Sequence, residues 1–399
     1  MKTSGISPTV FVLLALLASA PTLFMLSTQN FGQARNLLVD ATCFVCAGDL
    51  AWQGHDNPYN PADLKNCQTS HDKAHVPFFY PPPSLSLFVP LSFLPYEMAV
   101  WCFVAAGIFA LSYSYARLWQ IYITPLSATS PLRWCVLILF GLTQMAFVNL
   151  PYGQVNLPAL GVAMAFMTAS LDRRFIWAGI FLGFAIVLKS HFALLALLPL
   201  LRWERGTLIA MALTIMALAG ITTLIAPESW GQWYYLVLSR AEYDGAATLV
   251  GNAGALEYGF SLYAFLWRHF DGMALIVFYG VTALFIIGAA LRAFHIHRRS
   301  PREEVYKWAF PLVLALIYVL SPVTWLAHYV FLLPLIVYLL ANLANSHDFK
   351  RGFRIMGLLI LIITHESYAF LPPYQPDLLI LSVLLGTIFL LGDVFRRPA

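Results

Sequence analysis

Long runs of apolar residues dominate the chain, and most charged residues fall between them. The runs cover residues 8–28, 96–117, 132–149, 155–171, 175–201, 206–226, 272–292, 306–320, 326–343, 354–369 and 377–394. A helix of about 20 apolar residues spans the hydrocarbon core of a bilayer, so this pattern predicts an all-α polytopic membrane protein. Several runs are short for a full crossing, which is typical of helices that are broken or tilted around a cavity.

The composition supports a membrane protein and excludes several soluble classes. Hydrophobic residues make up 60% of the 399 residues and charged residues only 11%, whereas soluble domains are about a quarter charged. The net charge of +4 includes no basic block dense enough for nucleic acid, and five cysteines do not make a disulfide-rich framework. No internal repeat or flexible linker is visible, so we expect one integral membrane domain over residues 1–399.

Basic and acidic residues alternate from loop to loop, and this orients the chain. Of the 23 Lys and Arg residues, 17 lie at Lys2 or within residues 117–133, 173–174, 202–205, 292–307, 350–354 and 396–397. The positive-inside rule places these segments and both termini on the cytoplasmic side of a bacterial plasma membrane. Acidic residues collect in two large loops of the opposite parity, 29–95 and 227–271. We therefore expect the chemistry to face the periplasm or exterior.

The segment between two neighbouring basic loops predicts a re-entrant hairpin. Residues 171–174 and 202–205 are both basic, so the apolar run between them must enter the membrane and return. We expect the turn at Lys189, Ser190 and His191. With this hairpin the chain makes about 11 or 12 passes, with short helices in the first outer loop. The first run ends in Ala18-x-Ala20, like a secretory signal, but its length favours an uncleaved helix.

Asp40 is a carboxylate that follows soon after the first apolar run. If residues 37–52 form a helix, one face carries an apolar stripe of Leu38, Ala41, Val45, Gly48 and Trp52, which predicts a helix lying flat on the membrane. Asp40 lies beside small residues on another face, where a bulky substrate would fit. Asp40 would equally suit a helix N-cap, and the spacing leaves both interpretations open.

Two residues of the predicted hairpin turn, Lys189 and His191, are ionisable. An ionisable group inside the membrane costs about 2.5–3.5 kcal/mol and is by default a functional candidate. A lysine ammonium there would hold an anionic group such as a phosphate, although snorkelling to the interface is an alternative. His328, in "SPVTWLAHY", would start a crossing on the same side and could exchange protons near neutral pH. A lone histidine is more often structural.

Polar and aromatic residues in two other outer segments are candidate substrate contacts. Tyr80 precedes three prolines in "FFYPPPSLSLFVP", which cannot lie in a helix interior and predict a short half-buried segment. An aromatic belt at the interface would explain Tyr80 equally well. Gln154 and Asn156, in "PYGQVN", could hydrogen-bond a sugar or be satisfied by neighbouring helices.

Nothing in the chain calls for a metal, a nucleotide or another cofactor. His71 and His75 lack a third ligand, so a solvated loop is favoured over a metal site. No phosphate-binding glycine loop is present. Cys43 and Cys46 would lie outside the cell with Cys67, so either of them could form one disulfide with Cys67. A separate pair, Gly179 and Gly183, has the GxxxG spacing of close helix packing.

These segments occur together, in one order, in a known family. The chain resembles the membrane glycosyltransferases of family 87, which have the GT-C fold and use polyprenyl-phosphate sugars, through "DATCFVCAGDLAWQGHDNPY", "YPPPSLSLFVPLSFLP", "YGQVN", "AGIFLGFAIVLKSHFALLALLPLL" and "SPVTWLAHY". The resemblance implies that Asp40 is the catalytic carboxylate, that His328, the motif histidine, is a second catalytic residue, and that Lys189 is the membrane lysine. Ala41 and Cys46 depart from the family, which often has aromatic residues there.

The resemblance implies transfer of a hexose or pentose, mannose-like, from a polyprenyl phosphate to a lipid or glycan acceptor. Asp40 would act as general base in an inverting displacement, and Lys189 with Arg35 would stabilise the departing phosphate. Candidate substrate contacts are Tyr80, Gln154, Asn156, His191 and Trp325. Broken helices with charges at membrane depth also suit a transporter or flippase, which is the alternative, and a scaffold for envelope assembly is a third interpretation.

Overall fold

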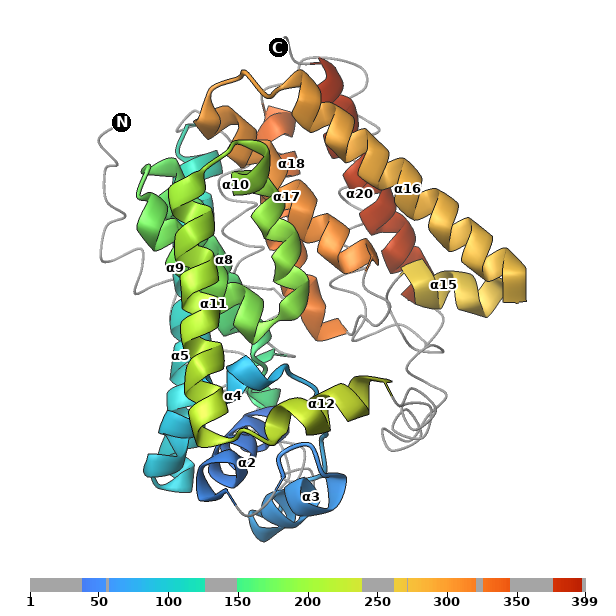
Figure 1. Cartoon of the computed structure of the whole chain (residues 1–399). Coiled ribbons are helices and arrows are strands. Elements are labelled where there is room, and N and C mark those ends of the chain that lie inside the picture. The colour runs from blue at the N-terminus through green and yellow to red at the C-terminus, as the bar shows by residue number, and fades with distance from the viewer. Residues whose placement is uncertain are drawn as a thin grey trace.

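Every regular element of the computed structural model is a helix within the part of the chain that it describes (Figure 1). Those residues are 38–54, 57–125, 149–238, 262–270, 272–320, 326–344 and 376–396. The all-α prediction is therefore confirmed. The predicted runs 8–28 and 354–369, and nearly all of 132–149, lie outside the described residues.

The first loop contains the predicted short helices. They are α2 (Val39–Gln53), α3 (Pro61–Ser70), η2 (Pro82–Ser84), α4 (Leu85–Phe88) and η3 (Val89–Phe93). They gather at one end of the molecule, below the long helices in Figure 1. A π-helical turn, η4 (Trp119–Ile123), continues the first long helix, α5 (Tyr96–Leu118).

The remaining elements are mostly long apolar helices. They are α8 (Asn156–Leu171), α9 (Phe175–Leu188), η5 (Ser190–Ala196), α10 (Leu197–Leu201), α11 (Arg205–Ile225), α12 (Ser229–Leu238), α15 (Leu262–His269), α16 (Gly272–Ile296), α17 (Arg302–Leu320), η6 (Leu326–Leu332), α18 (Leu333–Ala344) and α20 (Pro376–Arg396). Within the described residues, three segments are long and apolar enough to cross a membrane: Tyr96–Ile123, Arg205–Ile225 and Ile276–Ile296. Other apolar helices are shorter, as the sequence pattern predicted.

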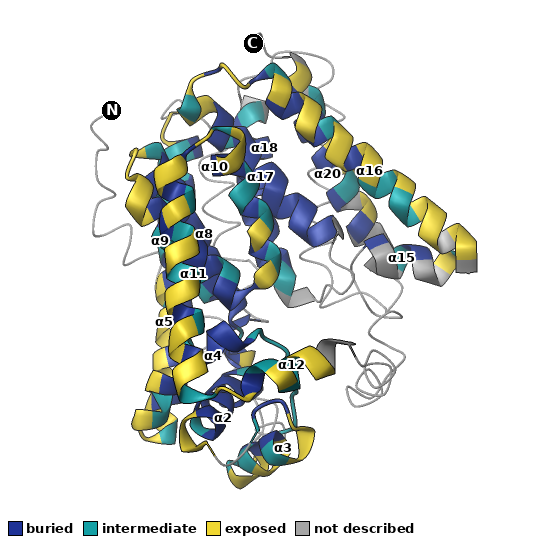
Figure 2. Ribbon diagram, in the orientation of Figure 1, coloured by how far each residue is buried: buried dark blue, intermediate teal, exposed yellow. Residues whose placement is uncertain are grey.

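The outer helices expose apolar side chains, as a bilayer requires. Leu224 on α11 is 86% exposed and Leu284 on α16 is 71% exposed, and yellow covers much of both helices in Figure 2. Buried residues instead line α8, α17 and α18. A soluble protein rarely exposes such continuous apolar surface, so these faces are suited to lipid.

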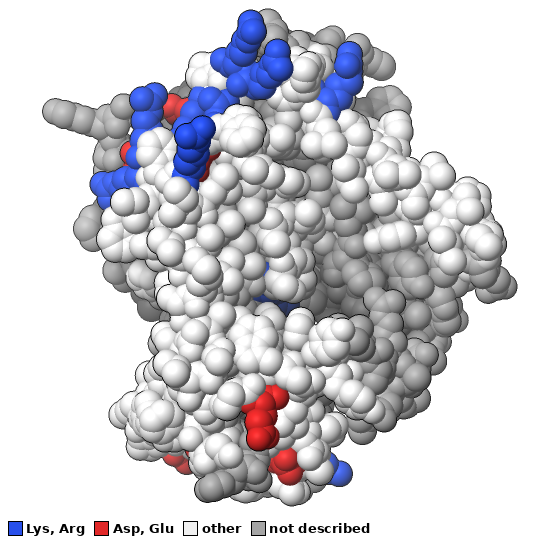
Figure 3. Space-filling model, viewed as in Figure 1, with Lys and Arg blue, Asp and Glu red and all other residues white. Residues whose placement is uncertain are grey.

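Charge is divided between the two ends of the molecule. In Figure 3 most Lys and Arg residues gather at the upper end with a few Asp and Glu among them, the lower end carries mainly Asp and Glu, and an almost uncharged belt separates the two ends. The ends of α5 illustrate this division, because Glu97 lies in its first turn and Arg117 in its last. Charges that avoid the middle of the molecule are expected of a protein whose middle lies in hydrocarbon.

The predicted re-entrant hairpin is confirmed. Helix α9 ends at Leu188, Lys189 has an extended backbone, and η5 and α10 then lead the chain back. The guanidinium of Arg302 contacts both the start and the end of this segment. It lies 4.6 Å from the Phe175 ring centroid and 2.6 Å from a Glu204 carboxylate oxygen. The hairpin therefore begins and ends at the same end of the molecule.

Helices α9 and α11 lie side by side in the same direction. A Cβ atom added to Gly179 would collide with the Thr207 carbonyl oxygen and lie 2.6 Å from the Ala210 Cβ atom. One turn later, a Cβ atom on Gly183 would lie 2.8 Å from the Thr214 Cβ atom. The interpretation of the GxxxG pair as helix packing is confirmed, and this contact holds the descending arm of the hairpin.

Helix α2 differs from the flat surface helix that its apolar stripe predicted. It packs against α3, α4, η3 and α5, and most of its residues are buried, including Phe44 and Ala47 outside the stripe. Trp52, at the end of the stripe, is 52% exposed. The prediction was wrong because protein elements that are distant in sequence cover the helix on several sides.

We expect Gly179→Ala to lower the free energy of unfolding by about 1–3 kcal/mol, the usual cost of overpacking. The added methyl group would force α9 away from α11. Gly220→Ala is a matched control, because a Cβ atom at Gly220 would meet nothing within 4 Å among the described residues. Thermal unfolding of both variants in detergent measures the difference, and equal stability of the two would contradict this packing.

Candidate active site

Asp40 lies in the first turn of α2, and its carboxylate is held by a residue from a distant loop. The helix begins after Leu38, which has a left-handed backbone (φ 57°) and whose N–H donates to the Pro151 carbonyl at 2.6 Å. Asp40 is therefore not the N-cap. Its half-buried carboxylate accepts a hydrogen bond of 2.6 Å from Nε2 of Gln154.

The loop that carries Gln154 fits closely against α2. Gly153 has φ +66°, and a Cβ atom there would lie 2.5 Å from the Ala41 Cβ atom, so only glycine allows this approach. Asn156 Nδ2 donates to Asn149 Oδ1 at 3.0 Å and lies 3.4 Å from Gln154 Oε1. This chain of amides directs the Gln154 NH2 group toward Asp40.

Lys189, at the tip of the hairpin, is only 6% exposed. Its Nζ atom lies 2.5 Å from His328 Nε2 and 5.8 Å from the centroid of the Phe331 ring. An ammonium has no acceptor, so Lys189 donates and the Nε2 atom of His328 accepts. The His191 ring lies 6.1 Å from the His328 ring. Lys189 is thus held inside the protein and does not snorkel.

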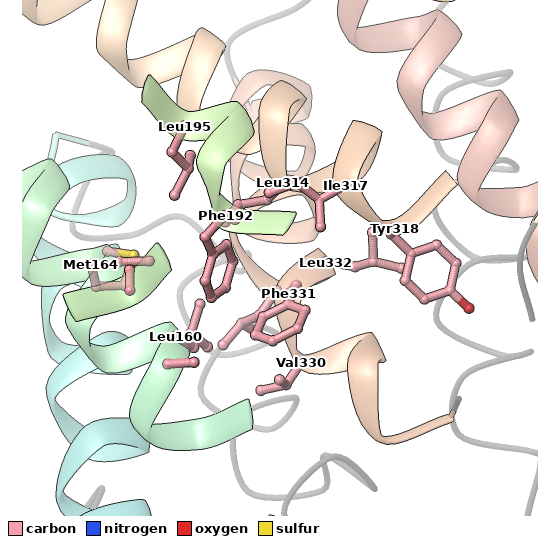
Figure 4. Close-up of a cluster of buried hydrophobic side chains, with 14 of the residues drawn as sticks. Leu160, Met164, Phe192, Leu195, Leu314, Ile317, Tyr318, Val330, Phe331 and Leu332 are labelled. Atoms are coloured by element: carbon pink, nitrogen blue, oxygen red, sulfur yellow. The ribbon is translucent and has the colours of Figure 1, made fainter. Parts of the chain in front are cut away.

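A hydrophobic cluster fixes the tip of the hairpin against η6. Figure 4 shows Phe192 and Leu195 from the hairpin among residues of other elements, namely Leu160, Met164, Leu314, Ile317, Tyr318, Val330, Phe331 and Leu332. The Phe192 and Phe331 rings meet edge to face, with centroids 4.9 Å apart. Lys189 lies three residues before Phe192 and His328 three residues before Phe331, so the apolar contact also sets the position of the polar pair.

The Asp40 carboxylate and the Lys189 ammonium interact electrostatically. Burial raises the pKa of Asp40 to about 7, while the nearby Lys189 ammonium and the Gln154 hydrogen bond oppose this rise. Each group alone would be costly to bury, and each provides part of the other's missing solvation. At neutral pH the Asp40 carboxyl can therefore either hold or release a proton.

Tyr80 lies close to the same carboxylate. Its ring packs against Phe44 and Phe78, with centroids 5.1 and 5.4 Å away, and Tyr59 donates to its carbonyl oxygen at 2.9 Å. Burial, and secondarily the Asp40 charge, raise the pKa of Tyr80. The phenol therefore stays protonated and can donate a hydrogen bond. Of the other predicted site residues, Arg35 and Trp325 lie outside the described residues.

Comparison with known proteins agrees with this architecture. Residues 78–322 match the sequence model of Glycosyltransferase family 87, which is more than half of the chain. The chain belongs to glycosyltransferase family 87. It is a polytopic membrane glycosyltransferase with the GT-C fold, and the transporter and scaffold interpretations are set aside.

Two relatives of this family 87 chain come from Mycolicibacterium smegmatis (strain ATCC 700084 / mc(2)155). One, a polyprenol-phosphate-mannose-dependent alpha-(1-2)-phosphatidylinositol mannoside mannosyltransferase, is 29% identical over 73% of this chain and 67% of its own length. The other is a polyprenol-phosphate-mannose-dependent alpha-(1-2)-phosphatidylinositol pentamannoside mannosyltransferase. It is 26% identical over 71% of this chain and 65% of its own length. The alignments thus span about two thirds of each relative. No solved structure matches the chain.

Two features of this family 87 site did not follow from the sequence. Asn149 completes the amide chain, and the only indication of it was its place in the same turn as Asn156. A disulfide joins Cys46 to Cys67 and ties α2 to α3, while Cys43 is free and buried. The spacing alone left that pairing open.

We expect Gly153→Ala to lower glycosyl transfer at least about tenfold, because the new methyl group would push Gln154 away from Asp40. Gly54→Ala is a matched control. Gly54 also has a positive φ of +71°, and its replacement carries the same backbone strain of about 1–2 kcal/mol, but no described atom lies within 4 Å of the added Cβ. Transfer by both variants in detergent provides the measurement, and equal activity would contradict a positioning role for this loop.

Proposed function

We propose that this chain transfers mannose from polyprenol-phosphate mannose to a hydroxyl group of a lipid or glycan acceptor at the outer face of a bacterial plasma membrane. The printed names of both relatives support the donor, and their acceptors are phosphatidylinositol mannosides. Family membership supports the reaction class. The main support is one arrangement of charged groups: Gln154 holds the Asp40 carboxylate at 2.6 Å, and the Lys189 ammonium, buried against His328, lowers the pKa of that carboxyl.

Asp40 is the general base of the proposed reaction. It takes the proton of the acceptor hydroxyl as that oxygen attacks the anomeric carbon of the donor. The new C–O bond forms while the bond to the phosphate oxygen breaks, so one displacement inverts the anomeric centre. A base is most effective when its pKa lies near the working pH, and the pKa of Asp40 is raised to about 7. Gln154 fixes the orientation of the carboxylate.

Lys189 stabilises the polyprenyl phosphate that leaves. Negative charge grows on the phosphate as its bond to the sugar breaks, and a fixed ammonium in a water-poor site acts strongly on such charge. His328 accepts a hydrogen bond from Lys189 and so positions it, and we assign His328 this role rather than direct proton transfer. Arg35 remains a candidate second cation for the phosphate.

Other residues take supporting roles. Asn156 is fully buried and already paired, so we assign it to orienting Gln154 rather than to contact with the sugar. Tyr80 keeps its proton beside Asp40 and is a donor for a sugar or acceptor oxygen. His191 lies next to the Lys189–His328 pair, and His191 and Trp325 remain candidate substrate contacts.

The acidic end of the molecule faces the exterior in this proposal. Basic residues gather at the opposite end, as the positive-inside rule requires of the cytoplasmic side (Figure 3). The Cys46–Cys67 disulfide lies in the same loop as Asp40, and disulfides persist mainly in oxidising compartments. Nucleotide sugars are cytosolic, so a transferase with an outward site needs a sugar carried by a membrane lipid.

We expect Asp40→Asn to lower mannosyl transfer by about 10²–10⁴-fold, the usual contribution of a general base. Asp49→Asn is the control, because Asp49 lies on the same helix with its carboxylate paired to Gln53 at 2.8 Å. Transfer from polyprenol-phosphate mannose in proteoliposomes provides the measurement. An Asp40→Asn variant as active as the Asp49→Asn variant would refute the assignment.

We expect the rate of transfer to fall as the pH drops through about 7, the raised pKa of Asp40. A carboxyl with a raised pKa is protonated below that value and then cannot accept the hydroxyl proton. The rate at pH 5 should therefore be about a hundredfold below the plateau above pH 8. Thermal unfolding at each pH controls for loss of the fold, and a flat profile in folded protein would contradict the role.

A further inference from the structure

A cavity at the basic end of the molecule, far from the Asp40 site, has no part in the proposed reaction. Its volume is about 350 Å³, near the lower limit of known ligand pockets. It lies where the hairpin returns, and its lining comes from the start of α9, the turn between α10 and α11, and the start of α17. The lining residues are Phe175, Arg202, Trp203, Glu204, Arg205, Gly206 and Arg302.

The wall of this cavity is positively charged. Three of its lining residues are arginines and one is a glutamate, so its formal charge is +3 − 1 = +2. Arg302 is paired with Glu204 at 2.6 Å, and its side chain is only 11% exposed. The charge of Arg302 is therefore balanced by Glu204 within the protein. Arg205 is exposed and Arg202 is half-buried, so both can be reached from outside. The surplus charge is therefore on the two arginines that an outside ligand can reach.

Apolar surface adjoins the charged wall. Trp203 is 75% exposed at the edge of the cavity, and exposed tryptophans typically lie at the level of lipid head groups. Beyond Gly206, the outer face of α11 continues with Ile209 and Leu213, which are 59% and 56% exposed. The cavity therefore has charged residues on one side and exposed apolar side chains on the other.

We propose that this cavity binds the phosphodiester head group of an anionic phospholipid in the leaflet opposite to the Asp40 site. Arg202 and Arg205 hold the phosphate, Trp203 lies beside the glycerol region, and the acyl chains follow the exposed face of α11. A soluble anion would use only the charged wall. The lipid uses the apolar surface as well, because its chains already lie in the bilayer beside α11.

A lipid in this position would support the hairpin at its base. Arg202 follows the returning arm directly, and it also donates to the Ser300 carbonyl at 3.2 Å, just before α17. Arg205 begins α11, which packs along the descending arm. One head group held by both arginines would therefore join the returning arm to α11, the helix that supports the descending arm.

The test titrates delipidated full-length protein in detergent with phosphatidylglycerol and follows thermal unfolding. Wild type should show a saturable rise in Tm, and phosphatidylcholine and glycerol phosphate should give none at the same concentration. Arg202→Gln/Arg205→Gln should weaken the apparent affinity about 25-fold, since each arginine near an anionic head group contributes about fivefold. Arg292→Gln, an exposed arginine of α16 that does not line the cavity, should behave as wild type.

Several outcomes would overturn the proposal. Absence of saturable binding to wild type would exclude a site. Equal weakening in the Arg292→Gln variant would show diffuse attraction to the whole basic end, and an effect of glycerol phosphate equal to that of the lipid would show a soluble-anion site. If the double variant does not fold without lipid, the single exposed change Arg205→Gln replaces it, with about a fivefold loss expected. Unchanged affinity in that variant would also refute the site.

Discussion

The architecture depends on keeping an ammonium group away from water at the tip of a hairpin. Lys189 is almost fully buried, and its removal from water has to be offset by His328, by the Phe331 ring and by the charge of Asp40. An ionisable group with such partners is stable only where several elements meet. The site is therefore inseparable from the packing that brings η5, η6 and α2 together.

That packing is built from two kinds of contact at the two ends of the hairpin. At the tip, Phe192 and Phe331 pack edge to face and fix η5 against η6. At the base, the buried pair of Glu204 and Arg302 joins the returning arm to α17. Between them, Gly179 allows α9 to lie directly against α11. The hairpin is thus held along its whole length, and the position of its lysine is defined.

The membrane explains why the chemistry is arranged in this way. Hydrocarbon excludes charge from the middle of the molecule, so polar residues remain at the ends or pair inside the fold. A donor whose sugar is carried on a lipid phosphate can approach from the bilayer itself. In the function proposed above, the buried Lys189 ammonium would meet the phosphate of such a donor, and the Asp40 carboxylate would meet the acceptor hydroxyl.

The sequence by itself determined the helical class, most helix positions, the hairpin turn at Lys189 and the family, because membrane thickness and charge asymmetry constrain apolar length and loop charge directly. Tertiary structure alone decided that Gln154 holds Asp40, that Lys189 meets His328, and that Cys46 rather than Cys43 pairs with Cys67. It also showed that α2 is covered by protein instead of lying on lipid. Periodicity specifies which face of a helix is apolar, but not whether lipid or a distant segment of the same chain will cover that face.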